Sequence, residues 1–267
     1  MFAFLKKRIP KLNTSYIQRK CGITATTFRS VDSTNKILKE YARQDAPHGT
    51  VVVAEAQTAG RGRGEHTFFS PLGTGVYLSV LLRYEQKSFR PADVTAAAGV
   101  AACEAIEKLT DRECKIKWMN DVYIDGKKVA GILAEAGSAP TGAYSKGKYV
   151  VVGIGFNVTK PDTDFPEEIR ERAGAIFSDK APRYVREELT VHFYTRLMRL
   201  LGKESASVYA AYRDRLFILG ETVEYEGRKA IVRDLLPDFR LVLDCEDGTV
   251  RYLDSGEVSL LQPYGIV

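Results

Sequence analysis

Gln57-Thr58-Ala59-Gly60-Arg61-Gly62-Arg63 lies between the apolar run Val51-Val52-Val53-Ala54 and the β-rich segment 75–82. Apolar runs of this kind on both sides indicate a loop that joins two strands of a folded sheet. The glycines allow positive φ and a close backbone approach to a ligand, and the arginines supply guanidinium forks that suit a phosphate or a carboxylate. Gly-Arg-Gly-Arg also occurs in disordered nucleic-acid-binding tails, but the flanking strands favour an anion-binding loop in a folded domain.

The composition is that of a soluble globular protein. The chain has 267 residues, 45% of them hydrophobic, which is enough for one large domain or a large domain with a small companion. No apolar run approaches the ~20 residues that span a bilayer. Residues 1–8 place their charges after a short apolar patch, the reverse of a signal peptide. We therefore expect a cytoplasmic protein that does not associate with membranes.

Several site classes lack support in the sequence. The cysteines at 21, 103, 114 and 245 form no C-x-x-C pair, which argues against a zinc site and a disulfide framework and favours free thiols. The three histidines form no H-E-x-x-H motif. The net charge of +5 is not concentrated in a Lys/Arg tract, so nucleic acid is not indicated as a partner.

The middle of the chain predicts strands and a helix in one mixed layer. From Pro91 to about residue 109, Ala, Val and Ile recur at helical spacing and indicate a buried helix. Asp125-Gly126 between β-rich runs is the strongest short-range hairpin signal. The strands cluster instead of alternating with helices, so the expected fold class is α+β. Further strands are expected at 115–118 and 149–154, and 77–83 is a candidate edge strand for pairing with a second copy.

The last part of the chain predicts a separate small unit. Helical spacing over 185–216 is interrupted near Gly202, which predicts two helices. After Gly220 the chain changes to short β runs separated by turn dipeptides. This pattern is typical of a small β-barrel. The expected strands are 222–225, 229–232, 239–243 and 250–253.

Five motifs in a fixed order carry a family resemblance. They are Asp32-Ser33-Thr34-Asn35, the loop 57–71, Lys117-Trp118-Met119-Asn120-Asp121 with the segment 128–135, Gly153-Ile154-Gly155-Phe156-Asn157-Val158, and Asp254-Ser255-Gly256-Glu257-Val258-Ser259-Leu260. Each motif alone is weak. Together they resemble the biotin protein ligases and cover nearly the whole chain from about residue 25.

The resemblance implies a fold, a reaction and partners. The fold is a mixed β-sheet flanked by helices, of the class II synthetase-like biotin/lipoate ligase type, with a C-terminal SH3-like β-barrel. The domains are an extension at 1–24, a catalytic domain at 25–217 and the SH3-like domain at 218–267. Biotin and ATP form biotinyl-5′-AMP and pyrophosphate, with Mg²⁺ as cofactor. The biotinyl group then passes to a lysine of a biotin carboxyl carrier domain. The protein is a monomer or a homodimer.

The implied biotin site needs neutral hydrogen-bonding groups around a urea-like ring, because an unpaired buried polar atom costs about 1–3 kcal/mol. Ser33, Thr34, Asn35 and Gln57 are of that type. The sequence 32–34 also fits an ordinary helix N-cap, and both interpretations can hold together. The full set of implied biotin-binding residues is Ser33, Thr34, Asn35, Gln57, Gly60, Arg61, Gly62, Arg63, Lys128 and Gly131.

The implied catalytic residues are Lys128, Arg63 and Arg61, because positive charge stabilises the carboxylate and the α-phosphate as they react. Side chains alternate along a strand, so one of Lys127 and Lys128 faces the pocket, and the resemblance favours Lys128. The implied ATP-binding residues are Arg63, Lys117, Asn120, Asp121 and Asn157, with Asp121 as the Mg²⁺ ligand. Asn-Asp before a strand is also an ordinary turn. Phe165 is a candidate for stacking on adenine.

Two features depart from the family or its larger members. The family continues its loop with Gly-Arg and then Trp, whereas Gly64-Glu65-His66-Thr67-Phe68 stands here. We expect this change to alter loop ordering or retention of the adenylate. Too few residues precede Asp32 for the winged-helix domain of bifunctional members, so we expect no sequence-specific DNA binding, and Lys6-Lys7-Arg8 is expected to be a solvated helix end.

Two other functions remain open at this stage. A lipoate–protein ligase shares the fold, but its loop has consecutive glycines after arginines instead of Gly60-Arg61-Gly62-Arg63. The altered loop also fits a protein that binds biotin or the adenylate and has weak transferase activity.

Overall fold

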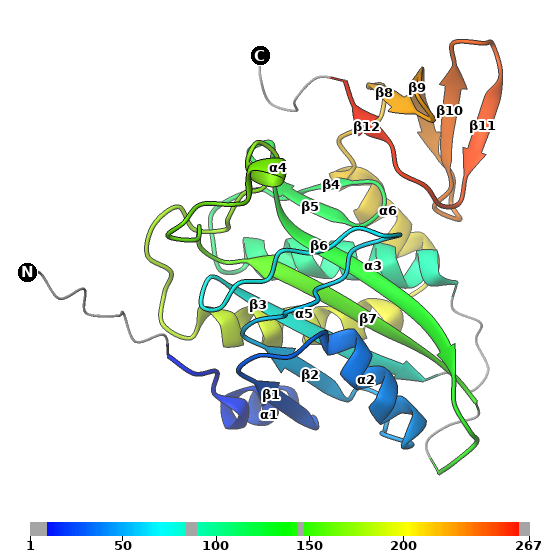
Figure 1. Ribbon diagram of the computed structural model, residues 1–267. Coiled ribbons are helices and arrows are strands. Elements are labelled where there is room, and N and C mark those ends of the chain that lie inside the picture. The colour runs from blue at the N-terminus through cyan, green and yellow to red at the C-terminus, as the bar shows by residue number, and fades with distance from the viewer. Residues whose placement is uncertain (1–9, 84–89, 144–146, 262–267) are drawn as a thin grey trace, which may run out of the picture.

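Apolar runs form the central strands of the main sheet (Figure 1). The structure, a computed structural model, describes residues 10–83, 90–143 and 147–261. Every position of β2 (Val51–Ala54) and β3 (Gly75–Arg83) is buried, as are the residues of β7 (Lys148–Asn157) between its two ends. Such runs are typical of strands covered on both faces.

The seven strands of this sheet lie in the order β1-β2-β3-β7-β6-β5-β4. β1 (Ala25–Phe28) is parallel to β2, and all other neighbours are antiparallel. Asp125 and Gly126, both at positive φ, turn the chain from β5 (Asp121–Ile124) into β6 (Lys127–Ser138). The predicted mixed sheet and hairpin are confirmed, and β4 (Lys115–Lys117) forms one edge.

β3 is an interior strand, so the expectation that 77–83 forms an edge for pairing with a second copy is wrong. Val80 pairs with Val51 on one side and with Val152 on the other. Both rows of backbone groups are therefore used within the sheet, and β3 offers no free edge.

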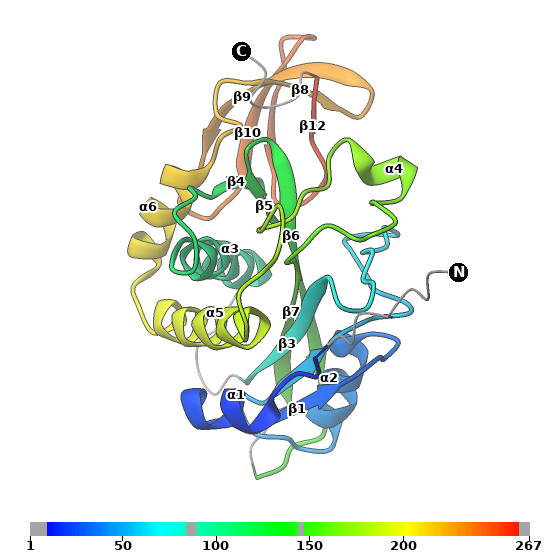
Figure 2. The same cartoon turned by 90° about the vertical axis from the view of Figure 1, so that its left-hand side faces the viewer.

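Helices cover both faces of the main sheet (Figure 2). α3 (Pro91–Glu107) begins with proline and is buried along almost its whole length. It lies on one face with α5 (Val185–Leu201) and α6 (Ser205–Arg215), which are separated at Gly202 as predicted. α2 (Thr34–Arg43) lies on the opposite face, where the site described below is found.

Among the described residues that precede β1, a short helix, α1 (Thr14–Cys21), packs on α5. Asn13 caps it by accepting a hydrogen bond from the Tyr16 N–H, and Gly22 ends it in the left-handed conformation. The predicted solvated helix end at Lys6-Lys7-Arg8 lies outside the described residues.

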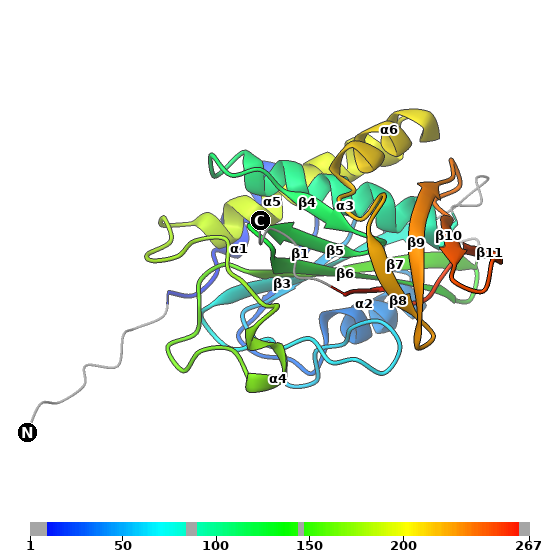
Figure 3. The same ribbon diagram turned by 90° about the horizontal axis from the view of Figure 1, so that it is seen from above.

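The C-terminal unit is a five-stranded antiparallel sheet beside α6 (Figure 3). Its order is β11-β10-β9-β8-β12, so the hydrogen bonding among the described residues ends at β11 and β12 without closing a barrel. Trp118 Nε1 donates to the Phe239 carbonyl at 2.9 Å and ties this unit to the end of β4. The strands are β8 (Thr222–Tyr225), β9 (Arg228–Leu235), β10 (Leu241–Cys245), β11 (Val250–Leu253) and β12 (Ser259–Leu260).

The remaining described helix, α4 (Glu167–Arg170), is a single turn in the connection from β7 to α5. No helix within the described residues combines the length and the apolar character needed to cross a lipid bilayer.

Candidate active site

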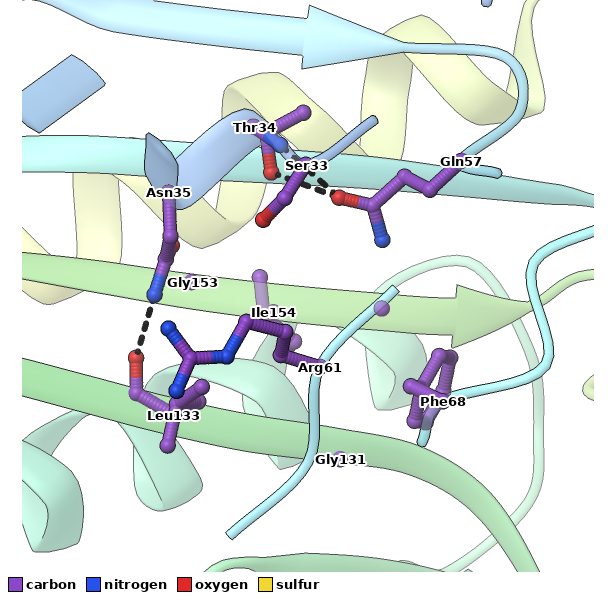
Figure 4. A pocket seen from close by; sticks show the side chains of 11 residues that line it. Ser33, Thr34, Asn35, Gln57, Arg61, Phe68, Gly131, Leu133, Gly153 and Ile154 are labelled. Carbon is purple, nitrogen blue, oxygen red and sulfur yellow. Dashed lines mark hydrogen bonds between the residues drawn. The ribbon is translucent and has the colours of Figure 1, made fainter. Parts of the chain in front are cut away.

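Two adjoining cavities lie on the α2 side of the main sheet, next to the loop 57–71. The inner pocket has a volume of about 30 Å³ and the outer pocket one of about 440 Å³, and Arg61, Phe68 and Gly131 line both. The structure thus brings most of the predicted site residues together. Ser33, Thr34, Asn35, Gln57, Arg61 and Gly131 line the inner pocket (Figure 4), and Arg61, Gly62, Arg63, Lys117, Asn120, Asp121, Lys128, Gly131 and Asn157 line the outer one.

The start of α2 forms one wall of the inner pocket. Ser33 is the N-cap residue of α2, but its side chain makes no capping hydrogen bond. Gln57 acts in its place, because its Oε1 accepts from the Thr34 N–H at 2.9 Å and from Thr34 Oγ1 at 3.2 Å. Gln57 Nε2 donates to Ser70 Oγ at 3.2 Å, which leaves its second hydrogen for a ligand. The segment 32–34 is both a helix start and a pocket wall.

Asn35 is fixed by an internal network. Ser79 Oγ donates to Asn35 Oδ1 at 2.6 Å and is 2.8 Å from Thr34 Oγ1. Asn35 Nδ2 donates to the Leu133 carbonyl at 3.3 Å and to Glu135 Oε2 at 2.8 Å. Both of its donor hydrogens are used within the protein, so Asn35 shapes the pocket wall more than it offers donors to a ligand.

Glycines make room on the floor of the site. A Cβ at Gly153 would lie 2.2 Å from Asn35 Oδ1, and one at Gly155 would lie 2.3 Å from the Phe68 ring. At Gly131 the Phe68 ring would be 2.9 Å away. Phe68, which stands where the family has Trp, therefore rests on the glycines of β6 and β7 at the boundary of the two pockets.

The loop itself is a small hairpin. The Gly62 N–H donates to the His66 carbonyl at 2.7 Å, and the Phe68 N–H donates to the Gly60 carbonyl at 2.9 Å. Gly60 lines neither pocket, and a Cβ there would lie 2.4 Å from the Phe68 carbonyl oxygen. Its role in the structure is to let the two arms of the hairpin approach each other.

The tip of this hairpin is docked on the C-terminal unit. Arg63 donates to the Gly256 carbonyl at 3.0 Å, and its guanidinium carbon lies 6.0 Å from the centre of the Trp118 ring. His66 Nε2 and Glu257 Oε2 are 3.0 Å apart. His66, in the segment that departs from the family pattern, thus contacts the segment that follows β11.

Cationic side chains gather in the outer pocket. Lys128 Nζ lies 2.8 Å from Asp121 Oδ1 and 5.9 Å from the centre of the Phe68 ring, at the boundary of the two pockets. Lys127 instead contacts Glu171, so it is Lys128 that faces the site. Burial lowers the pKa of Lys117, and the carboxylates of Asp121 and Glu257 partly offset this. The pocket therefore suits a polyanion.

Two asparagines of the outer pocket hold strands in place. Asn120 Nδ2 donates to the Ile132 carbonyl and to Asp121 Oδ1, each at 3.1 Å. Asn157 Nδ2 donates to the Gly174 carbonyl at 3.0 Å and faces the Lys128 carbonyl at 3.5 Å. Asn157 thereby supports the backbone at Lys128.

A metal ion has few potential protein ligands in this part of the molecule. The described residues contain no group of three or more His, Cys, Asp or Glu side chains placed to hold a metal. Asp121 is the predicted ligand and already pairs with Lys128. One carboxylate fits the usual binding of Mg²⁺, which takes most of its oxygen ligands from substrate phosphates and water.

Several lining residues were absent from the predicted set. Arg172 carries charge, Phe68 separates the pockets, and Gly256, Glu257 and Val258 form a wall supplied by the C-terminal unit. Glu135, which contacts Asn35 and Arg61 behind the inner pocket, was also absent from that set. Period-2 alternation from Lys128 would not have found Glu135, because a β-bulge shifts the register of β6 against β5. Phe165, predicted to stack on adenine, lines the outer pocket with its ring 6.5 Å from that of Phe69.

Comparisons with known proteins identify the family of this chain. The biotin/lipoate A/B protein ligase family model matches residues 27–157. The bifunctional ligase/repressor BirA of Bacillus subtilis is 39% identical over 146 residues, which cover 55% of this chain and 44% of that protein, less than half of its length. BirA of Escherichia coli is 35% identical over 247 residues, covering 90% of this chain and 74% of that protein.

Among solved structures, the biotin protein ligase of Aquifex aeolicus in complex with biotin and ATP superposes with a TM-score of 0.70 at 30% identity. The match covers 89% of this chain and 98% of that one. Fold, motif order and these similarities lead to one conclusion: the chain belongs to the biotin protein ligase family.

Proposed function

We propose that this protein is an ATP-dependent biotin–protein ligase, which forms biotinyl-5′-AMP and transfers the biotinyl group to a lysine of a biotin carboxyl carrier domain. One observation carries the proposal: a small pocket with neutral hydrogen-bonding groups, crossed by Arg61, adjoins a large cationic pocket, and Lys128 lies next to Phe68, which lines both. That pair of pockets matches two substrates. One has a neutral ring and a carboxylate on a side chain, and the other is a nucleoside triphosphate.

The inner pocket is the place for the ring of biotin. Ser33 Oγ, the free hydrogen of Gln57 Nε2 and the remaining lone pair of Thr34 Oγ1 are the groups available to a urea-like ring. Their neutrality matters, because a buried unpaired charge beside a neutral ring would be costly. Gly131, Gly153 and Gly155 make room for the Phe68 ring and the Asn35 side chain, which shape the walls around the ring.

The carboxylate of biotin is activated where the two pockets meet. A carboxylate oxygen of biotin attacks the α-phosphorus of ATP, an acyl–phosphate bond forms, and pyrophosphate leaves. Lys128, Arg61 and Arg63 provide positive charge at this point, and Lys117 and Asn120 line the outer pocket, where the nucleotide binds. The Asp121 carboxylate, 2.8 Å from Lys128 Nζ, orients that ammonium group. Asn157 acts through the backbone of Lys128.

Mg²⁺ would enter with the triphosphate and be held by its phosphates and by Asp121. When bound, it supplies charge that neutralises the phosphate oxygens. The cationic side chains that line the outer pocket would hold the phosphates from the protein side.

Transfer completes the cycle. The amine of an acceptor lysine attacks the acyl carbon, the amide bond forms and AMP leaves. Arg63, held by the Gly256 carbonyl and next to Trp118, closes the pocket over the adenylate until the acceptor arrives. We also propose a cytoplasmic location, in keeping with the free thiols of Cys21, Cys103, Cys114 and Cys245.

The test is a reconstitution with ATP, biotin and a purified biotin-acceptor domain, read by mass spectrometry. We expect the acceptor to gain one biotinyl group, and lipoate in place of biotin to give none. Lys128→Ala serves as the inactive control. Modification by lipoate alone would identify the other branch of the family, and adenylate formation without transfer would identify a binding protein with weak transferase activity.

A further inference from the structure

The inner pocket is narrow, and the proposed function, on which this inference rests, puts the ring of biotin there. A side chain that crosses this pocket must move aside before the ring enters.

Most of the wall is fixed. Asn35 and Gln57 are held by the hydrogen bonds described above, and the glycines belong to the backbone of central strands. Arg61 is different, because it lies on the loop and its side chain is 57% exposed. Figure 4 shows this side chain extending across the pocket toward Asn35 and Leu133.

Glu135 holds the Arg61 side chain in that position. Glu135 Oε1 lies 3.4 Å from Arg61 Nη1 and accepts a hydrogen bond from Lys39 Nζ at 2.6 Å. Glu135 Oε2 accepts from Asn35. The carboxylate is only 17% exposed, so solvent screens these contacts less than it does a surface pair.

Glu135 is charged in this setting. Burial raises its pKa, but the hydrogen bonds from Lys39 and Asn35 and the charges of Lys39 and Arg61 together hold the pKa below its ordinary value. One anion is thus shared between two cations, of which Lys39 has the shorter contact and Arg61 the longer. Breaking the Arg61–Glu135 contact should therefore cost less free energy than breaking the Lys39–Glu135 contact.

We propose that Glu135 is a positioning residue that keeps Arg61 across the mouth of the inner pocket, and that opening of the Arg61–Glu135 contact admits the ring of biotin. The Asn35–Glu135–Lys39 part of the network stays in place when the contact opens. Lys39 sets the strength of the contact, because it competes with Arg61 for the same carboxylate oxygen.

The first test is Glu135→Gln, which keeps an acceptor for Asn35 and removes the charge that holds Arg61. The probe is biotinamide, which is uncharged, so long-range attraction of a carboxylate does not contribute. We expect its association rate constant, measured by stopped flow, to rise about two- to fivefold, the range for one partly exposed ion pair. A rate constant equal to that of the wild type would overturn the proposal.

The matched control is Lys39→Met, which leaves Arg61 as the main cationic partner of Glu135. We expect the association rate constant for biotinamide to fall, opposite to the change in Glu135→Gln. A Glu135 that merely supports the fold would change both variants in the same direction, and that result would also overturn the proposal.

A second variant keeps the proposal testable if Glu135→Gln folds poorly, which circular dichroism would reveal. Arg61→Gln removes the same contact from the exposed side and should raise the rate constant to a similar extent, and the double variant should add nothing further. Additive increases would contradict a shared contact. A wild-type chain that binds neither biotin nor biotinamide would contradict the proposed function itself, whereas unchanged rates in a binding-competent variant contradict only the role of Glu135.

Discussion

The inner and outer pockets share residues of the loop 57–71 and of β6, yet they differ in size and in how their polar groups are paired. In the inner pocket the polar groups are largely paired with one another, as the hydrogen bonds of Asn35 and Gln57 show, and its volume is about 30 Å³. In the outer pocket the cations face a space of about 440 Å³. We therefore expect the inner pocket to select a neutral ring by shape and a few remaining donors, and the outer pocket to select a polyanion by charge.

The difference predicts that substitutions separate the two substrates. Changes in the inner pocket should affect biotin through fit, and changes in the outer pocket should affect the nucleotide and the adenylate through charge. Only residues at the boundary should affect both.

The largest effect is expected at that boundary, from Lys128→Ala. The substitution removes a charge from the reacting centre and no core volume, so adenylate formation should fall on the order of a hundredfold or more while the fold is kept. Pyrophosphate exchange measures the loss. Lys127→Ala, beside it but directed toward Glu171, is the matched control and should stay near wild type. Exchange within threefold of wild type in Lys128→Ala would remove Lys128 from the reacting centre.

Arg63→Gly tests the outer pocket, because it should affect the adenylate and leave biotin binding nearly unchanged. A charge-assisted hydrogen bond to the adenylate is worth about 1.5–3 kcal/mol, so its loss should speed release of the adenylate roughly ten- to a hundredfold. Biotin affinity should change little. Labelling of added serum albumin, read by streptavidin blot at matched adenylate-forming activity, measures the leak. Equal labelling by both forms would mean that Arg63 does not retain the intermediate.

Gly153→Ala should act on the inner pocket alone. The new Cβ would lie 2.2 Å from Asn35 Oδ1, so the Asn35 side chain must shift and the pocket wall with it. We expect the KM for biotin to rise about tenfold with the KM for ATP nearly unchanged. Gly202→Ala, where the nearest neighbour would be 3.6 Å away, is the control. Equal changes in both KM values would show that the pockets are not independent at this point.

The smallest effect concerns the order of binding. Biotin should bind before ATP, because the loop that closes the nucleotide site must be ordered, at about 1–2 kcal/mol per residue, and contacts with biotin offset part of that cost. Calorimetry should give a severalfold higher ATP affinity in the presence of biotin. Equal ATP affinities would mean that the hairpin seen here is already fully ordered in the free protein.

Local patterns predicted most of the elements, and long-range pairing explains what they missed. Pro91, the Ala-rich run and Asp125-Gly126 determine structure within a few residues of themselves, so α3 and the β5–β6 hairpin were predictable. β3 was misjudged because its partner β7 lies about 70 residues farther along the chain, as in the pair Val80 and Val152. Its nearly unbroken apolar run was the available signal of a central strand.

The same distinction between local patterns and long-range contacts applies to the site. Motifs placed Ser33, Gln57, Arg63 and Lys128, since each lies in a short segment with recognisable chemistry. The use of both Asn35 donors inside the protein depends on Leu133 and Glu135, about a hundred residues away, and no local pattern carries that information. The assigned chemical roles of these residues remain predictions for the experiments above.

The docking of the hairpin tip has a consequence for the synthesis of the chain. Arg63 and His66 reach partners 193 and 191 positions later in the sequence. A chain emerging from the ribosome therefore cannot dock the hairpin tip over its outer pocket until the segment with Gly256 and Glu257 has been synthesised and has folded. We expect nascent chains to be unable to hold biotinyl-adenylate, so that the reactive acyl donor is confined to enzyme molecules whose synthesis has passed that point.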